Sequence, residues 1–147
     1  MTAFTVDDVQ ALPGRTLPGG SFVIEPYQQW LMNDVVLGMQ TGDRTAHPIF
    51  VYVAATGAMG LTWDELFEMC GASASDGPMF GESETIVDTP LRVQRGYEVR
   101  GQFCSAERKQ GRKAGTFDIV GFELEIVDGD HVVARTRNSI VFPRRTP

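Results

Sequence analysis

PIFVYVAATGAMGL, residues 48–61, is the stretch that decides how this chain folds. It is the longest apolar run in the 147 residues, and only Thr56 interrupts it. A helix needs about 18 to 20 apolar residues to span a bilayer, so this run is too short to cross a membrane. A segment that is apolar on every side and rich in Ala and Gly is typical of a helix enclosed by closely approaching backbone. We therefore predict a buried helix from Pro48 that the rest of the chain surrounds.

Two further helices are predicted beside this run. Pro26 is placed as the first-turn residue of a helix, and apolar side chains then recur at helical spacing to about Leu37. After the run, Thr62 and Glu65 form a capping box for a second short helix. Gly71 is positioned to end that helix in the left-handed conformation.

Strands dominate the remaining sequence. Residues 21–24 resemble a short strand, and four longer segments are rich in β-branched and aromatic residues. These four segments are residues 86–93, 97–106, 116–127 and 132–142. The Asp128-Gly129 pair indicates a tight hairpin, whereas residues 71–81 have the composition of a mobile turn.

The third long strand contains a break in its alternation. Phe117 and Ile119 occupy odd positions, whereas the apolar residues from Val120 onward occupy even ones. Because successive side chains of a strand point to opposite faces, one inserted residue would reverse them. We predict a β-bulge at residues 119–121 that bends the strand. The alternative is a strand that is buried on both faces near its start.

The order of these elements predicts the architecture. A strand, a helix, a loop, a central helix and then four long strands are typical of the α+β hotdog fold, in which a curved antiparallel sheet wraps around a central apolar helix. A chain of 147 residues is expected to form a single domain of this kind, residues 1–147.

Composition excludes several classes of function. A net charge of −6 argues against nucleic-acid binding and against an anionic membrane surface, because both require clustered positive charge. The amino terminus carries acids where a secretion signal would carry basic residues, which predicts a cytoplasmic protein. Cys70 and Cys104 are too few for a disulfide framework and are expected to be small core residues.

Several motifs, in this order, resemble one known family. They are residues 6–36, the Ala46-His47-Pro48 triplet, and FGESETI at residues 80–86 followed by TPLRV at residues 89–93. These segments are similar to the MaoC-like enoyl-CoA hydratases and dehydratases, and closest to their amino-terminal, fatty-acid-synthase-type dehydratase branch. The resemblance implies a hotdog dimer in fatty acid, polyketide or steroid metabolism. Its substrate would be an acyl thioester of coenzyme A or of an acyl carrier protein, with no other cofactor and no metal.

The same resemblance identifies a candidate catalytic pair. In the catalytic branch, an Asp-x-Asn-Pro-x-His motif supplies a carboxylate and an imidazole that move protons beside the thioester. The related segment here, TGDRTAH at residues 41–47, keeps Gly-Asp-Arg but lacks Asn-Pro and is one residue shorter. Either Asp43 and His47 form a compressed dyad, or His47 only opens the central helix and the catalytic segment has been deleted.

Pro48 favours the deletion. In the catalytic pattern a Gly follows this histidine, and a backbone N–H at the helix start can stabilise the thioester oxyanion. Proline has no N–H, so Ile49 is left as the candidate oxyanion donor for a bound substrate.

A basic cluster in the predicted hairpin after residue 106 is a second candidate for substrate binding. It consists of Arg108, Lys109, Arg112 and Lys113. Positive charge with the bidentate geometry of arginine suits the diphosphate of coenzyme A or a phosphopantetheine phosphate. The alternative is a solvated hairpin tip.

Four functions follow from these observations. The leading hypothesis is a subunit that shapes the substrate tunnel of a hydratase or dehydratase beside a catalytic MaoC-like partner in a heterodimer. The first alternative is a self-sufficient homodimeric (R)-specific enoyl-CoA hydratase or 3-hydroxyacyl dehydratase that uses Asp43 and His47. The others are a hotdog thioesterase and a noncatalytic module that binds acyl-CoA or an acyl carrier protein.

Overall fold

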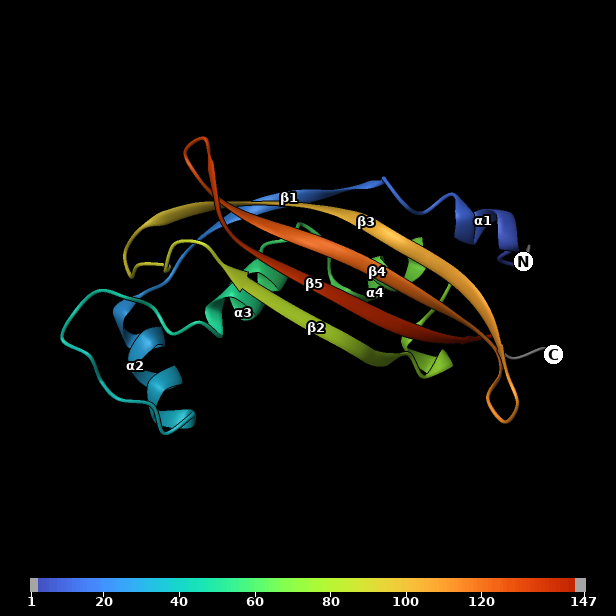
Figure 1. The fold of residues 1–147 in the computed structure, drawn as a ribbon, viewed down its shortest axis with the longest axis horizontal. Helices are drawn as coiled ribbons and strands as arrows, with labels where there is room; N and C mark the ends of the chain where they lie inside the picture. Colours follow the sequence, from blue (N-terminus) through green and yellow to red (C-terminus); the bar gives the residue numbers. More distant parts are fainter. Residues whose placement is uncertain (1–2, 145–147) are drawn as a thin grey trace.

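The computed structural model describes residues 3–144 as five β-strands, four short α-helices and one 3-10 turn (Figure 1). The helices are α1 (Val6–Gln10), α2 (Pro26–Val35), α3 (Phe50–Gly57) and α4 (Trp63–Met69), and the turn η1 covers Ala74–Asp76. The strands are β1 (Thr16–Val23), β2 (Met79–Val87), β3 (Gly96–Gly111), β4 (Gly115–Asp128) and β5 (His131–Arg144). Among residues 3–144, no helix has the length and the apolar composition that crossing a membrane requires.

All five strands form one antiparallel sheet with the order β1-β3-β4-β5-β2. Hairpins join β3 to β4 and β4 to β5, and the second contains the predicted Asp128-Gly129 turn, where Gly129 has a φ of 61°. The long strands bend along their length, and α3 packs against one face of this curved layer (Figure 1). The predicted hotdog architecture is therefore confirmed.

The two flanking helices also begin where the sequence predicts. α2 starts at Pro26, and α4 follows a capping box in which the Glu65 N–H donates to the Thr62 hydroxyl at 3.2 Å. Gly71 follows α4 with a φ of 64°, and a Cβ at this position would lie 2.2 Å from the Phe4 ring. Glycine is therefore required there both by the backbone conformation and by the close contact.

The core lies between α3 and the inner face of the sheet. Val51 and Ala55 of α3 are fully buried, as are Phe103 and Phe122, which lie opposite each other on β3 and β4, and Phe142 of β5. Burying each of these large side chains stabilises the fold by about 1.5–3 kcal/mol. The core therefore fixes where α3 lies and which of its faces remains open.

That open face corrects the prediction that the central helix is enclosed on every side. α3 is shorter than the apolar run, and Ile49, Val53 and Gly57 form an exposed stripe along it, with Ile49 37% and Val53 41% exposed. These residues are four apart, so they lie on one side of the helix. An apolar run that contains no regularly spaced polar residues does not indicate which side of the helix will face away from the sheet.

The strand predicted at residues 86–93 is wrong in its bounds. β2 covers Met79–Val87, so its first residues lie in the segment expected to be a turn. Pro90 lies in the connection that follows β2, which agrees with the rarity of proline inside paired strands.

The bulge was predicted on the wrong strand. β4 keeps its alternation, because Asp118 is buried in phase with Val120 and Phe122. The register of the β3–β4 pair shifts between Phe103 and Ser105 instead, so the extra residue is Cys104. Cys104 is exposed there, which corrects its assignment to the core, whereas Cys70 is buried as expected.

Asp118 is buried because two arginines neutralise it. Arg108 donates to both of its carboxylate oxygens at 2.7 and 2.9 Å, and Arg144 donates to Oδ2 at 2.6 Å. Arg108 also donates to the Phe4 carbonyl, and Arg144 to the Gly71 carbonyl. This network joins β3, β4 and β5 to the amino-terminal segment and to the end of α4.

The two edges of the sheet differ. On β1, Pro18 precedes a bulge at Gly19, whose N–H donates at 2.9 Å to the Met59 carbonyl of the α3–α4 connection. A Cβ at Gly20 would lie 2.7 Å from the Ala58 carbonyl, so this connection also covers the edge. On β2, every residue except Ile86 is exposed. The sheet therefore has one edge that is covered at its middle, at Gly19 and Gly20, and one edge that is open along its length.

We predict that Asp118→Asn lowers the free energy of unfolding by about 3–5 kcal/mol, because two arginines would lose the charge that compensates them. Urea denaturation checks this value. Glu125→Gln is the matched control, since Glu125 pairs with solvent-accessible Arg100 and the partly exposed Arg135, and its loss should cost less than about 1 kcal/mol. Equal effects of the two substitutions would contradict the assignment of Asp118 as the central charge of the fold.

Candidate functional site

His47 lies just before α3, and its imidazole is part of the local hydrogen bonding there. The His47 N–H donates to Gln29 Oε1 of α2 at 2.8 Å, and its Nδ1 accepts the Ile49 N–H at 3.1 Å. Nδ1 must be unprotonated to accept, so a neutral ring carries its proton on Nε2. The Ile49 N–H, which is the candidate oxyanion donor, thus already donates a hydrogen bond to the His47 side chain.

Asp43 is occupied within its own loop. Its Oδ1 accepts the Thr45 N–H at 3.1 Å and the Thr41 hydroxyl at 3.0 Å. The hydrogen bond from the Thr45 backbone, followed by that from the Thr41 side chain, lowers the pKa of Asp43. This carboxylate is therefore charged at neutral pH and is a poor proton donor.

Asp43 and His47 have separate hydrogen-bond partners. Within residues 3–144, no hydrogen bond or ion pair joins the two side chains. Each has a partner that stabilises local structure: Asp43 closes a turn, and His47 caps the start of α3. The structure thus places the predicted pair in one region without bringing the two groups together.

An apolar groove runs beside the open face of α3. It has a volume of about 240 Å³ and is lined by Phe50, Val53 and Gly57 of α3 and by Phe22 from β1. Gln28 of α2 supplies a polar side chain at its wall. A Cβ at Gly57 would meet no atom within 4 Å, so the groove is open at this residue. Its shape and lining suit an apolar chain.

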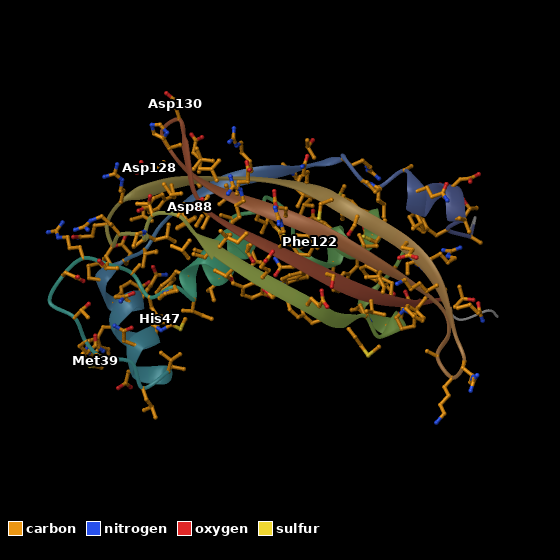
Figure 2. The ribbon with its side chains drawn as sticks, in the orientation of Figure 1. Met39, His47, Asp88, Phe122, Asp128 and Asp130 are labelled. Atoms are coloured by element: carbon orange, nitrogen blue, oxygen red, sulfur yellow. The ribbon has the colours of Figure 1, made fainter. Side chains whose placement is uncertain are left out.

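Exposed apolar side chains of α2 and the loop after it lie at the same end of the molecule as His47. Figure 2 places His47 and Met39 there together. The exposed residues are Tyr27, Trp30, Leu31, Val35, Val36, Leu37 and Met39, and Leu37 is 93% exposed with a φ of 54°. So many large exposed apolar side chains on one helix and its loop are typical of a surface that contacts another molecule.

The basic cluster lies far from this region. The β3–β4 hairpin that carries it is at the opposite end of the molecule from His47 (Figures 1 and 2). Arg108 is engaged by the buried Asp118, and Lys109 lies 3.3 Å from Glu107. Arg112 and Lys113 remain at the exposed tip. A phosphate site formed by these two would be separate from the groove beside α3.

Other catalytic groups are scarce among residues 3–144. No three His, Cys, Asp or Glu side chains there are grouped to hold a metal ion. Burial raises the pKa of the Cys70 thiol to about 12 and also raises the pKa of Cys104. Both thiols are therefore protonated near neutral pH and are weak nucleophiles.

Sequence reasoning missed two parts of this site. Gln29 holds the segment before α3, but a glutamine on a helix gives no signal of its partner. The groove depends on Val53 and Gly57, which belong to the apolar run but are exposed. Their spacing of four residues was visible in the sequence, whereas the side of α3 that faces the sheet was not.

Solved structures similar to this chain include two complexes from Mycobacterium tuberculosis. The C-terminally truncated HadBC complex, a 3R-hydroxyacyl-ACP dehydratase, shares 13% identity over 88% of this chain and 96% of its own, with a TM-score of 0.67. The ChsH1-ChsH2 complex shares 15% identity over 97% of this chain and 96% of its own, with a TM-score of 0.69. A MaoC-like dehydratase from Rhodospirillum rubrum shares 12% identity over 92% of this chain and 94% of its own, with a TM-score of 0.60.

These similarities establish that the chain has the fold of MaoC-like dehydratases. A gentisyl-coenzyme A thioesterase is also similar, with 12% identity over 84% of this chain and 85% of its own and a TM-score of 0.54. The fold therefore does not choose between hydration and thioester hydrolysis. No family model matches the sequence, and no curated protein does.

We predict that His47→Ala lowers the free energy of unfolding by about 1 kcal/mol, because the Ile49 N–H loses its acceptor. His47→Asn should keep most of that stability, since asparagine Oδ1 occupies the same position along the side chain as histidine Nδ1. Thermal and urea unfolding of the three proteins checks this order. Equal destabilisation by Ala and Asn would show that the imidazole does not act as a cap.

Proposed function

We propose that this chain is the substrate-shaping subunit of an acyl-thioester hydratase or dehydratase and acts beside a catalytic MaoC-like partner. Its substrate would be an acyl-CoA or an acyl carrier protein thioester. In this proposal the partner supplies the acid–base pair, and the present chain supplies one wall of the space that receives the acyl group.

The state of Asp43 and His47 carries the proposal. Reversible hydration needs one group that handles the proton of water and one that handles the proton on the carbon beside the carbonyl. Here the carboxylate and the imidazole each satisfy neighbouring backbone, and the Ile49 N–H is engaged by His47. These residues support the folding of the loop, so the reacting groups are expected from elsewhere.

The groove beside α3 supports a role in binding the acyl group. Its lining is mostly apolar apart from Ser21 and Gln28, and it begins beside α2, whose Gln29 fixes the start of α3. An alkyl chain laid along Val53 and Gly57 would remove an exposed apolar stripe from water, which is favourable in proportion to the area buried. A thioester headgroup would then lie towards the α3 start.

Two surfaces support a partner subunit. The β2 edge is open to another strand, and the apolar side of α2 is uncovered. HadBC and ChsH1-ChsH2, which share the fold, are complexes of two differently named chains. Pairing along β2 would bring the second subunit to the side of the sheet that is not covered by the α3–α4 connection.

A partner screen with crotonyl-CoA tests the proposal. The chain alone should not hydrate this substrate, whereas its co-purified complex with a MaoC-like protein encoded nearby should do so. Within the complex, His47→Asn should leave turnover nearly unchanged, while substitution of the partner's motif histidine should abolish it. Turnover by the chain alone that His47→Asn abolishes would instead establish the self-sufficient enzyme.

The remaining alternatives give different results in the same assay. Release of free coenzyme A without hydration would identify a thioesterase. Saturable binding of acyl-CoA with no conversion in any partner combination would identify a binding module. Arg112→Ala with Lys113→Ala tests the hairpin tip, because loss of a diphosphate contact should weaken binding of acyl-CoA more than binding of the corresponding acyl-pantetheine.

We further predict that Gly57→Leu in the active complex shortens the accepted acyl chain. The new side chain would fill the groove, so kcat/KM for a long-chain enoyl-CoA should fall by about tenfold or more while that for crotonyl-CoA changes little. Gly57→Ala, which adds one methyl group to open space, should have a smaller effect in the same direction. An equal loss for short and long substrates would contradict the groove as the acyl site.

A further inference from the structure

We propose that the open β2 edge is built to reject a second copy of this chain and to accept a different subunit whose edge strand carries basic residues. This inference rests on the proposed function and deepens it, because it specifies the chemistry of the partner. It is carried by the charges on β2 and by the symmetry that pairing two copies would impose.

β2 carries acidic residues and no basic ones. Its sequence, MFGESETIV, places Glu82 and Glu84 on either side of Ser83, and Asp88 follows the strand directly. All of β2 around these glutamates is exposed. The register of the β2–β5 pair shifts between Phe80 and Ser83, so Glu82 lies at a bulge, and the two carboxylates lie only two residues apart on the exposed edge.

Because of these charges, symmetric pairing of two β2 strands from two copies of the chain is unfavourable. Two identical edge strands that pair around a two-fold axis run antiparallel, and each residue then lies opposite a position fixed by the axis. With the axis at Ser83, the middle of β2, the antiparallel order brings Glu82 beside the second copy's Glu84 despite the bulge, and the contact is repeated by symmetry. An axis at Glu82 or at Glu84 places that residue opposite itself. Like charges directly opposite each other destabilise a strand pair.

The neighbouring strand only partly neutralises this edge. Arg137 of β5 approaches Glu84 at 3.5 Å, but it also pairs more closely with Glu123 of β4. Arg135 pairs with Asp88 at 3.3 Å and with Glu125 at 3.5 Å. Within residues 3–144, Glu82 has no ion pair. Of the two glutamates beside the middle of the edge, Glu82 is therefore the less compensated.

A basic edge strand resolves the conflict. A partner with Lys or Arg at two positions separated by one residue would place a cation opposite each glutamate in the antiparallel pair. Opposite charges in such cross-strand pairs are favourable, and complementary charge also accelerates the encounter of the two subunits. The other edge of the sheet is less accessible to a strand, because the α3–α4 connection contacts β1 at Gly19 and Gly20.

A charge-reversed copy of this chain serves as the probe partner. The variant Glu82→Lys with Glu84→Lys presents a basic β2 edge on the same fold. Sedimentation velocity at about 0.1 M salt, where the Debye length is about 10 Å, should find the wild-type chain alone and the variant alone mainly monomeric. Their equimolar mixture should form a heterodimer with a Kd at least about tenfold below that of either chain alone.

The control reverses the same number of charges away from the edge. Glu98→Lys with Glu107→Lys changes two exposed residues of β3 and the same net charge. Its mixture with the wild-type chain should show no such dimer. Circular dichroism and thermal unfolding establish that each variant is folded, and the single variant Glu82→Lys replaces the double variant if that protein is unstable. Self-association of the single variant should exceed that of the wild-type chain, since the introduced lysine would lie opposite the second copy's Glu84.

Three results would overturn the inference. They are a wild-type homodimer that is unaffected by Glu82→Lys, a mixture that remains monomeric, and equal association of the β3 control. Raising the salt to about 1 M, where the Debye length is about 3 Å, should weaken the heterodimer if charge drives it. The proposed function is tested separately by hydration of crotonyl-CoA. If the charge-reversed mixture forms a heterodimer but no complex with a MaoC-like partner hydrates crotonyl-CoA, the proposed function is refuted and this inference stands.

Discussion

α3 packs its small and branched side chains against the concave face of one antiparallel sheet. The close contact between this helix and the sheet determines the position of the groove and of the segment before α3. Ala55 and Val51 are buried without residual exposure, and the backbone of Gly20 approaches the Ala58 carbonyl so closely that no side chain fits between them. Because one side of the helix is fixed in this way, the opposite stripe through Val53 and Gly57 must face outward. The same contact places the start of α3 beside α2.

Local signals in the sequence predicted much of this fold. Pro26, the Thr62–Glu65 capping box and the Asp128-Gly129 turn each act within a few residues, and each element begins or ends where those signals lie. The sequence-based predictions were wrong where residues distant in the sequence determine the local structure. Asp118 reads as a polar interruption of β4, yet Arg108 and Arg144 from the neighbouring strands make its burial favourable. The burial of a charge depends on partners that the local pattern does not contain.

The candidate site shows the same division. The sequence could place Asp43 and His47 in one segment, but it could not determine whether their side chains meet, since that depends on competing hydrogen-bond partners. In the structure these partners are the Thr45 N–H and the Ile49 N–H, both supplied by backbone only two residues away. Backbone donors in this short loop thus engage both side chains.

The unequal edges of the sheet limit how large an assembly of this fold can become. β2 offers exposed residues along its whole length, whereas β1 is interrupted in its middle by Pro18, by the bulge and by the contact of Gly19 with Met59. Once β2 is occupied, a further strand on the far side would have to pair across this interrupted segment. Filament growth by continued strand addition is therefore disfavoured in the native state.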